Sequence, residues 1–287
     1  MTELGIALAL ACAATANVAM LCKHRGARAA PEVCMRRPLR SGAALFRSRW
    51  WTIGFAVAFV AWLLHVAAIA IAPLSHVQAV IAGGLVLLAL PAQRWFGHRI
   101  GRREWLGLGL AAAGLAFIAF TLPGGGGGGG YSLAAMIGFQ SAMIGAGLAL
   151  FVAGALGSEH PGRGIALGVA SGLLIGVANV AIKALTQTVP DDVLALASPW
   201  TAVAAFAGVG AFFALARGMQ LGAAVPVIAT ASVATNCGAI IGGVLVFGDP
   251  IGSGFAEGAA RCAAFAAVIV AAALMPSPEH RPRLQPA

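Results

Sequence analysis

The sequence predicts an all-α, polytopic membrane protein with nine transmembrane helices, arranged as two inverted four-helix repeats and one extra linking helix. Three observations lead to this prediction: an apolar composition, nine long apolar segments, and positive charge confined to every second gap between them. Of the 287 residues, 60% are hydrophobic and 9% are charged, whereas an average soluble domain carries about a quarter charged residues. Such a chain is expected in hydrocarbon rather than in water.

The nine apolar segments have the length that a membrane span requires. Each has roughly 20 residues, which at ~1.5 Å per residue cross a hydrocarbon core of ~30 Å. Backbone groups in lipid must pair within their own segment, and the alternation typical of strands is absent, so helices are expected. The segments cover residues 3–22, 50–72, 74–92, 104–122, 131–156, 164–187, 199–217, 222–247 and 253–275.

Lysine and arginine follow the odd-numbered segments and are absent from the gaps after the even-numbered ones. By the positive-inside rule the basic gaps face the cytoplasm, which places the N-terminus outside and the C-terminus inside. The net charge of +9 therefore indicates anionic lipid headgroups as a partner, and nucleic acid is not expected. The basic residues are Lys23, Arg25, Arg28, Arg36, Arg37, Arg40, Arg47 and Arg49 after the first segment, Arg94, Arg99, Arg102 and Arg103 after the third, Arg163 and Arg217 after the fifth and seventh, and Arg281 and Arg283 in the tail.

Aromatic residues lie near the expected span boundaries. Trp and Tyr concentrate at the two membrane–water interfaces, where one part of the ring system is apolar and another is wet. The sequence therefore places Trp50, Trp51, Trp95 and Trp105 at the inner interface, and Tyr131 and Trp200 at the outer one.

Two short sequence echoes indicate an internal repeat. Phe96–Gly101 ends the third segment as Phe247–Gly252 ends the eighth, and Gly5–Leu8 of the first segment matches Gly164–Leu167 of the sixth. Spans one to four therefore correspond to spans six to nine. Four spans return the chain to the side on which it began, and the extra fifth span makes the second copy run in the opposite direction. Inverted repeats of this kind are typical of secondary transporters.

The repeat divides the chain into five parts. Seven consecutive glycines, Gly124–Gly130, are expected to form a flexible external linker, because glycine has no side chain to pack. This run lacks the Lys-Ser/Thr of a phosphate-binding loop, and no His/Asp/Glu cluster lies at one depth, so neither ATP hydrolysis, nor a cofactor, nor enzymatic activity is expected. The parts are 1–122, the first repeat with a basic cytoplasmic loop at 23–49; 123–130, the linker; 131–156, the extra span; 157–275, the second repeat; and 276–287, a cytoplasmic tail.

Loose glycine, proline and charge motifs resemble a known family over most of the chain. They are similar to the end of an EamA-type repeat, which defines the drug/metabolite transporter (DMT) superfamily. The resemblance implies a permease that moves a small molecule by alternating access. The motifs are Ala72–Gln78, Gly83-Gly84-Leu85 and Trp95–Gly107 with Gly114 beyond it, and Pro226–Ile251 for the second copy.

Two departures from the family pattern leave the substrate and the coupling ion open. DMT members usually carry ten spans in two sets of five, whereas here the basic stretch 23–49 stands where a second span would be. The nine-span arrangement is similar to the branch that includes NIPA-type magnesium transporters. Members also tend to have Glu in the turn after Phe-Gly, where this chain has His98 and Asp249.

Ionisable side chains inside the predicted spans are functional candidates, because each costs roughly 2.5–3.5 kcal/mol to insert. Glu257 and Arg261 lie four residues apart, in the order that favours an intrahelical ion pair; they form either a structural pair or a gate that contacts an anionic substrate. His65 lies deep in the second span, and histidine can exchange a proton near neutral pH. It is either a proton-coupling residue or a hydrogen-bonded structural one. Lys183, near the outer end of the sixth span, is expected to reach the headgroups.

Amide and hydroxyl side chains supply the other polar groups of the predicted spans. Interhelical amide hydrogen bonds are worth only ~0.6–2 kcal/mol in lipid and commonly hold helices together, so each residue is either a packing residue or a substrate contact. Asn17 and Asn179 correspond in the repeat, and Asn236 lies near the middle of the eighth span. The candidate transport pathway comprises His65, Asn17, Asn179, Asn236, Thr235, Gln78, Glu257 and Arg261, with no metal site.

Three functions remain open at this point. The first is a DMT-type permease for a small metabolite or drug-like solute, with a proton or cation as coupling ion. The second is a NIPA-type magnesium or divalent-cation transporter, against which the scarcity of carboxylates within the spans argues, because Mg²⁺ prefers carboxylates and waters. The third is a non-transporting structural or assembly protein. The residue usage and the resemblance indicate a bacterial cytoplasmic (cell) membrane, and an oligomer is left open.

Overall fold

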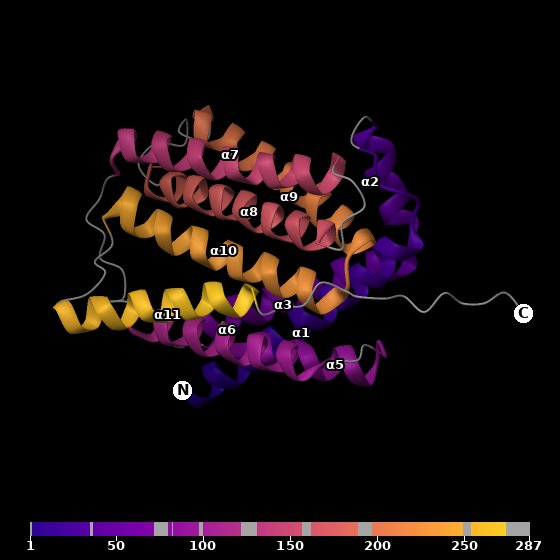
Figure 1. Ribbon diagram of the computed structural model, residues 1–287, viewed down its shortest axis with the longest axis horizontal. Helices are drawn as coiled ribbons and strands as arrows, with labels where there is room; N and C mark the ends of the chain where they lie inside the picture. Colours follow the sequence, from indigo (N-terminus) through magenta and orange to yellow (C-terminus); the bar gives the residue numbers. More distant parts are fainter. Residues whose placement is uncertain are drawn as a thin grey trace, which may run out of the picture.

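The computed structural model describes residues 2–34, 37–71, 80–81, 83–97, 100–121, 131–156, 162–188, 197–248 and 254–273. Within those ranges the chain is helical and contains no strand. Most helices run along the long axis of the molecule, and α2 crosses one end of the bundle (Figure 1). The elements are α1 (Thr2–Ala29), α2 (Pro38–Arg47), α3 (Arg49–Ile71), η1 (Gly84–Leu88), α5 (Ala89–Arg94), α6 (Arg102–Thr121), α7 (Leu133–Leu156), α8 (Arg163–Thr188), α9 (Pro199–Leu221), α10 (Ala224–Phe247) and α11 (Phe255–Ala273).

Five helices in the described part of the chain, α1, α7, α8, α9 and α10, are long and apolar enough to cross a membrane. Their positions agree with five of the predicted spans. The protein is therefore an all-helical, multi-pass membrane protein, as the composition predicts. α3, α6 and α11 occupy the predicted spans 50–72, 104–122 and 253–275, and the total of nine spans stays a prediction.

The predicted span 74–92 is described in part, and that part is not a regular α-helix. Gly84–Leu88 forms the 3₁₀ segment η1, which leads directly into the short helix α5. A 3₁₀ stretch inside a longer helix often marks a hinge or local strain. Gln78, the glycine linker at 124–130 and the tail at 276–287 lie outside the described residues.

The basic stretch 23–49, expected to be a loop, is largely helical. α1 continues through it as far as Ala29, and α2 begins at Pro38, in the first helical position that proline favours. Basic side chains in the last turn of a helix are favourable, because they lie next to the partial negative charge of its C-terminus. Arg28, the basic residue in the last turn of α1, therefore also supports the end of this helix.

Two cation–π contacts fix the basic extension of α1 on α3. Lys23 Nζ lies 4.2 Å from the centre of the Phe55 ring, and the Arg25 guanidinium lies 4.2 Å from that of Trp50. Such contacts are worth ~0.5–2 kcal/mol, depending on solvation. They let the positive charges of one helix pack on the aromatic side chains of its neighbour.

The helices within each predicted half pack on one another. α1 packs along α3 in the first half, and α8 packs along α9 and α10 in the second. The extra helix α7 lies on α8, and α6 pairs with α11, so that the last helices of the two halves meet (Figure 1). Each half therefore pairs its first helix with its second.

Backbone geometry recurs at repeat-related positions. Gly97 and Gly248, the glycines of the two Phe-Gly turns, have φ angles of 66° and 68°. This left-handed region is readily available only to glycine. The sequence echo between the two turns therefore corresponds to a shared backbone conformation.

The first and third predicted spans of each half are in close contact. Gly84 of η1 packs against Ala13 of α1. In the second half, Gly172 of α8 packs against Ala231, Ala234 and Thr235 of α10. The inverted relation of the two halves stays a prediction.

Candidate functional site

The two halves are hydrogen-bonded to each other at the end of the bundle that carries α2, hereafter the basic end. Gln220, in the last turn of α9, donates from its amide to the carbonyl oxygens of Ala27 and Pro31, both at 3.0 Å. Its side-chain oxygen accepts from the backbone N–H of Val33 at 3.0 Å. One glutamine of the second half therefore holds the end of α1 and the segment that follows it.

Two further contacts lie beside Gln220. His24 Nε2 is 3.1 Å from the carbonyl oxygen of Gly222, and His24 is only 3% exposed. Arg217 forms a salt bridge with Glu32. We call His24, Glu32, Arg217, Gln220 and Gly222 the basic-end latch. It joins residues far apart in the sequence across the boundary between the halves.

The helices near this boundary are more tightly packed at the basic end than at the other end. Every residue of α10 from Ala224 to Ala231 is buried, whereas Ile241 and Leu245 are 39% and 60% exposed. α1 shows the same trend. Its C-terminal, basic part is buried except on one side, whereas Leu4 near its N-terminus is 61% exposed. The latch therefore closes the end at which the halves are in closest contact.

The repeat-related amides Asn17 and Asn179 lie in different surroundings. Asn17 is 9% exposed and donates to the carbonyl oxygen of Gly84 at 2.9 Å, where the 3₁₀ segment begins. Asn179 is exposed on α8, and the described residues make no hydrogen bond to its side chain. Asn17 thus holds two helices together, whereas the polar atoms of Asn179 are not used by the described fold.

Thr235 and Asn236 lie on α10 where its complete burial ends, and both are partly exposed. Thr235 Oγ1 donates to the carbonyl oxygen of Gly172 at 3.3 Å, and Asn236 donates to the carbonyl oxygen of Ser232 at 2.8 Å within its own helix. The side-chain oxygen of Asn236 makes no hydrogen bond among the described residues. The structure does not describe Gln78, the remaining amide of the predicted pathway.

Glu257 and Arg261 form the predicted ion pair, and the arginine also bonds to a second helix. Arg261 Nη2 lies 3.7 Å from Glu257 Oε2. Arg261 is 5% exposed and also donates to the hydroxyl and the carbonyl oxygen of Thr121, while the Glu257 side chain is 55% exposed. The guanidinium therefore fixes α11 to the end of α6, which favours a structural interpretation of the pair.

Arg261→Gln is expected to destabilise the protein much more than Glu257→Gln. The first change removes charge-assisted hydrogen bonds to Thr121, worth about 1.5–3 kcal/mol each. The second removes an exposed partner, worth about 0–1 kcal/mol. Thermal unfolding of the detergent-solubilised variants measures the difference. Loss of transport by Glu257→Gln with an unchanged unfolding temperature would instead support a gate.

His65 and Lys183 take positions that sequence alone does not specify. His65 lies on the face of α3 that packs on α1, between the buried residues Ala61 and Ala68, and is partly exposed. Lys183 Nζ lies 4.2 Å from the centre of the Phe247 ring at the end of α10. The lysine thus contacts an aromatic ring of the bundle in addition to its expected approach to the headgroups.

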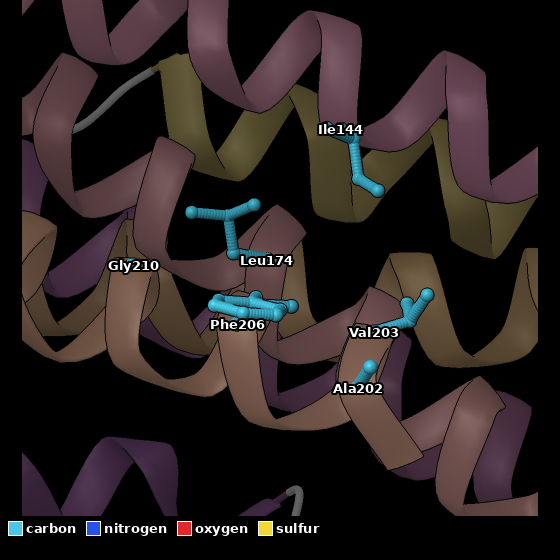
Figure 2. Close-up of a pocket in the computed structure, with 7 residues that line it drawn as sticks. Ile144, Leu174, Ala202, Val203, Phe206 and Gly210 are labelled. Carbon is cyan, nitrogen blue, oxygen red and sulfur yellow. The ribbon is translucent and has the colours of Figure 1, made fainter. Parts of the chain in front are cut away.

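An apolar groove of about 290 Å³ lies between α7, α8 and α9. Figure 2 shows its labelled lining as hydrocarbon only, with Ile144, Leu174 and Phe206 contributed by the three helices in turn. Phe206 is 77% exposed. A groove with this lining can accept hydrocarbon but offers no hydrogen bond to a polar solute.

Acidic and sulfur side chains do not gather into a metal centre in the described residues. No group of three or more His, Cys, Asp or Glu side chains there is arranged to hold a metal ion. The polar groups described above on α1, α8 and α10 are mainly amides, hydroxyls and backbone carbonyls. These groups can form hydrogen bonds to a neutral solute or to the water shell of an ion.

The chain is similar along most of its length to one curated protein. That protein, the probable magnesium transporter NIPA9 of Arabidopsis thaliana, is 25% identical over 260 residues, which cover 86% of this chain and 74% of the relative. No protein-family model matches the chain, and no solved structure matches it. The similarity therefore relates the chain distantly to a membrane protein with a transporter name.

Proposed function

We propose that this chain is a membrane transporter that moves a small solute by alternating access between two inverted halves. The observation that carries the proposal is the relative named a magnesium transporter, which matches 86% of the chain. The shared left-handed turns at Gly97 and Gly248 support a repeat. Many secondary transporters are built from inverted repeats. For this chain we expect nine spans, with the basic end in the cytoplasm.

The latch suggests how the two sides alternate. In the described conformation the halves are joined at the basic end, and α1 and α10 are less buried toward the opposite end. A solute would enter from that opposite end and leave after the latch separates. The latch consists of hydrogen bonds and one ion pair, each worth a few kcal/mol at most. The apolar contact of Trp51 with Phe212 of α9 joins the same two halves and would have to separate as well.

Magnesium is the first candidate substrate, from the name of the relative. Mg²⁺ dehydrates reluctantly and usually keeps several of its waters. Amide and hydroxyl groups such as those of Asn179, Thr235 and Asn236 could hydrogen-bond to these waters without a dedicated carboxylate cage. Recognition of this kind would favour moderate affinity and rapid release, which suits a transport site.

A small neutral metabolite or drug-like solute is the second candidate. Thr235 and Asn236 on the partly exposed half of α10 are uncharged, and uncharged hydrogen-bonding groups match a neutral polar solute. The sequence motifs that resemble the DMT superfamily point the same way. A coupling proton, with His65 as its carrier, belongs to this second candidate.

Flux into proteoliposomes tests the proposal and separates the two substrates. With a magnesium-sensitive dye inside, an inward Mg²⁺ gradient is expected to give dye signal well above that of protein-free liposomes. A parallel panel of amino acids, nucleosides and cationic dyes, with an imposed pH gradient, tests the second candidate. If neither arm exceeds the protein-free background, the protein is not the transporter proposed here.

Asn17→Ala is expected to lower the stability of the protein, whereas Asn179→Ala is expected to lower its transport rate. Loss of the Asn17 bond to Gly84 should lower stability by ~0.6–2 kcal/mol, seen as a lower unfolding temperature in detergent. Asn179→Ala should leave the unfolding temperature unchanged and lower the flux severalfold, because no described residue depends on its side chain. Normal flux through Asn179→Ala would remove this residue from the pathway.

A further inference from the structure

α2 is an amphipathic helix that lies across the basic end of the bundle (Figure 1). Ser41 and Leu45, one turn apart, are its buried residues. The Ser41 hydroxyl accepts from the backbone N–H of Cys34 and donates to the Cys34 carbonyl oxygen, both at 3.0 Å. One face of α2 is therefore fixed to the bundle and to the segment that carries Glu32.

The opposite face of α2 is apolar and uncovered at Leu39, which is 88% exposed, and at Ala43, which is exposed as well. Phe46 lies at the edge of this face: its ring packs on Phe55 of α3 and Phe212 of α9, with ring centres 4.9 and 6.4 Å apart, and the residue is 47% exposed. Residues spaced i, i+4 and i+7 share one side of a helix. Exposed apolar area costs ~25 cal/mol per Å² in water, but such a stripe is typical of a helix that lies in the membrane interface.

Arginines border this apolar face. Arg40 and Arg47, seven residues apart and hence on one side of α2, are exposed next to it, and the exposed Arg37 precedes the helix. The stretch 23–49 holds eight basic residues and a single acidic one, Glu32, which is paired with Arg217. Positive charge next to exposed hydrocarbon is complementary to an anionic phospholipid, which has a phosphate above its acyl chains. A second copy of α2 would bring like charges together.

We propose that α2 binds anionic phospholipids at the basic end, with Arg40 and Arg47 on the phosphate groups, Leu39 and Ala43 among the acyl chains, and the exposed part of Phe46 beside them. Through Ser41 and Cys34 the bound lipid also fixes the segment that carries the first-half part of the latch. This lipid site does not involve the transported substrate, so it can be tested separately from the transport function.

Lipid-specific quenching tests this proposal on the full chain. In a variant with the five native cysteines replaced by alanine, Leu39→Cys is labelled with a fluorophore and reconstituted with brominated phosphatidylglycerol or brominated phosphatidylcholine. Quenching at position 39 is expected to be severalfold stronger with the anionic lipid. Ala44→Cys, on another side of α2, is expected to show little quenching by either lipid. Equal quenching of position 39 by the two lipids would overturn the proposal.

Charge variants identify the groups that select the lipid. Arg40→Gln with Arg47→Gln should remove most of the excess of anionic over zwitterionic quenching, because each arginine near an anionic surface contributes ~1 kcal/mol. Arg94→Gln with Arg102→Gln removes equal charge from exposed positions on α5 and α6 and should leave the excess unchanged.

Two controls separate other occupants of the same face. If inorganic phosphate abolishes the excess at constant ionic strength, α2 binds a free anion and the lipid assignment is wrong. If the quenching of the fluorophore at position 39 depends on the protein-to-lipid ratio, a second copy of the protein covers this face, and the lipid assignment is also wrong. An excess that withstands both controls supports the lipid site.

Discussion

Cross-linking Glu32→Cys to Arg217→Cys is expected to reduce transport to the protein-free background. The two side chains form the ion pair of the basic-end latch, and alternating access requires the halves to separate at this end. The native latch is held by noncovalent contacts that can break and form again, whereas a covalent bridge cannot open thermally. The measurement is solute flux in proteoliposomes before and after a short, reducible bifunctional thiol reagent, in a variant without the native cysteines. Reduction of the bridge should restore the flux.

A matched pair at the other end controls for the chemistry. Tyr131 OH accepts from Trp200 Nε1 at 2.7 Å, and both residues belong to the group formed by α7 and α9. Tyr131→Cys cross-linked to Trp200→Cys should therefore leave flux within about twofold of the untreated value, since no boundary between the halves is bridged. Full flux through the Glu32–Arg217 cross-link, verified by mass, would show that the latch does not move during transport. Absence of flux before cross-linking would instead count against the transport function itself.

The predictable part of this fold is the part that depends on local sequence. Apolar runs define the spans because each helix satisfies its own backbone hydrogen bonds in lipid, and the five membrane-length helices confirm that reasoning. The two Phe-Gly turns could also be predicted from the sequence, because a left-handed backbone conformation locally restricts the residue to glycine. Both signals need no knowledge of what lies next to the helix.

The latch escapes prediction because its partners are distant in the sequence. Glu32 and Arg217 are separated by 185 positions, and His24 and Gly222 by 198. Nothing near Gln220 distinguishes a glutamine that binds three backbone groups from one that faces water at the end of a span. The clue that was present is Glu32, a single acid within a strongly basic stretch.

Trp51 and Trp50, both expected at the inner interface, have different surroundings in the structure. Trp51 is 2% exposed and packs edge-on against Phe212 of α9, with ring centres 5.6 Å apart. Its indole N–H has no hydrogen-bond partner in the described structure. Trp51 is therefore part of the core that joins the halves, whereas its neighbour Trp50 is 36% exposed.

Gly26→Ala is expected to destabilise the protein by about 1–3 kcal/mol, the usual cost of overpacking a close contact. A Cβ atom at position 26 would lie 2.7 Å from the Cα atom of Trp51 and 2.8 Å from its Cβ atom. These are backbone or near-backbone atoms, so a change of side-chain rotamer cannot relieve the clash. α1 and α3 would have to move apart, and the cation–π contacts of Lys23 and Arg25 would weaken with them.

Gly208→Ala is the control, because it is expected to leave stability unchanged or to raise it slightly. Position 208 also lies within a long helix, α9, but a Cβ atom there meets nothing within 4 Å. Since glycine is ~0.5–1 kcal/mol worse than alanine inside a helix, this substitution should be neutral or slightly stabilising. Unfolding temperatures of the two variants in the same detergent separate the effects. If Gly26→Ala is as stable as Gly208→Ala, α1 and α3 do not approach as closely as described, and the first-half side of the latch has a different support.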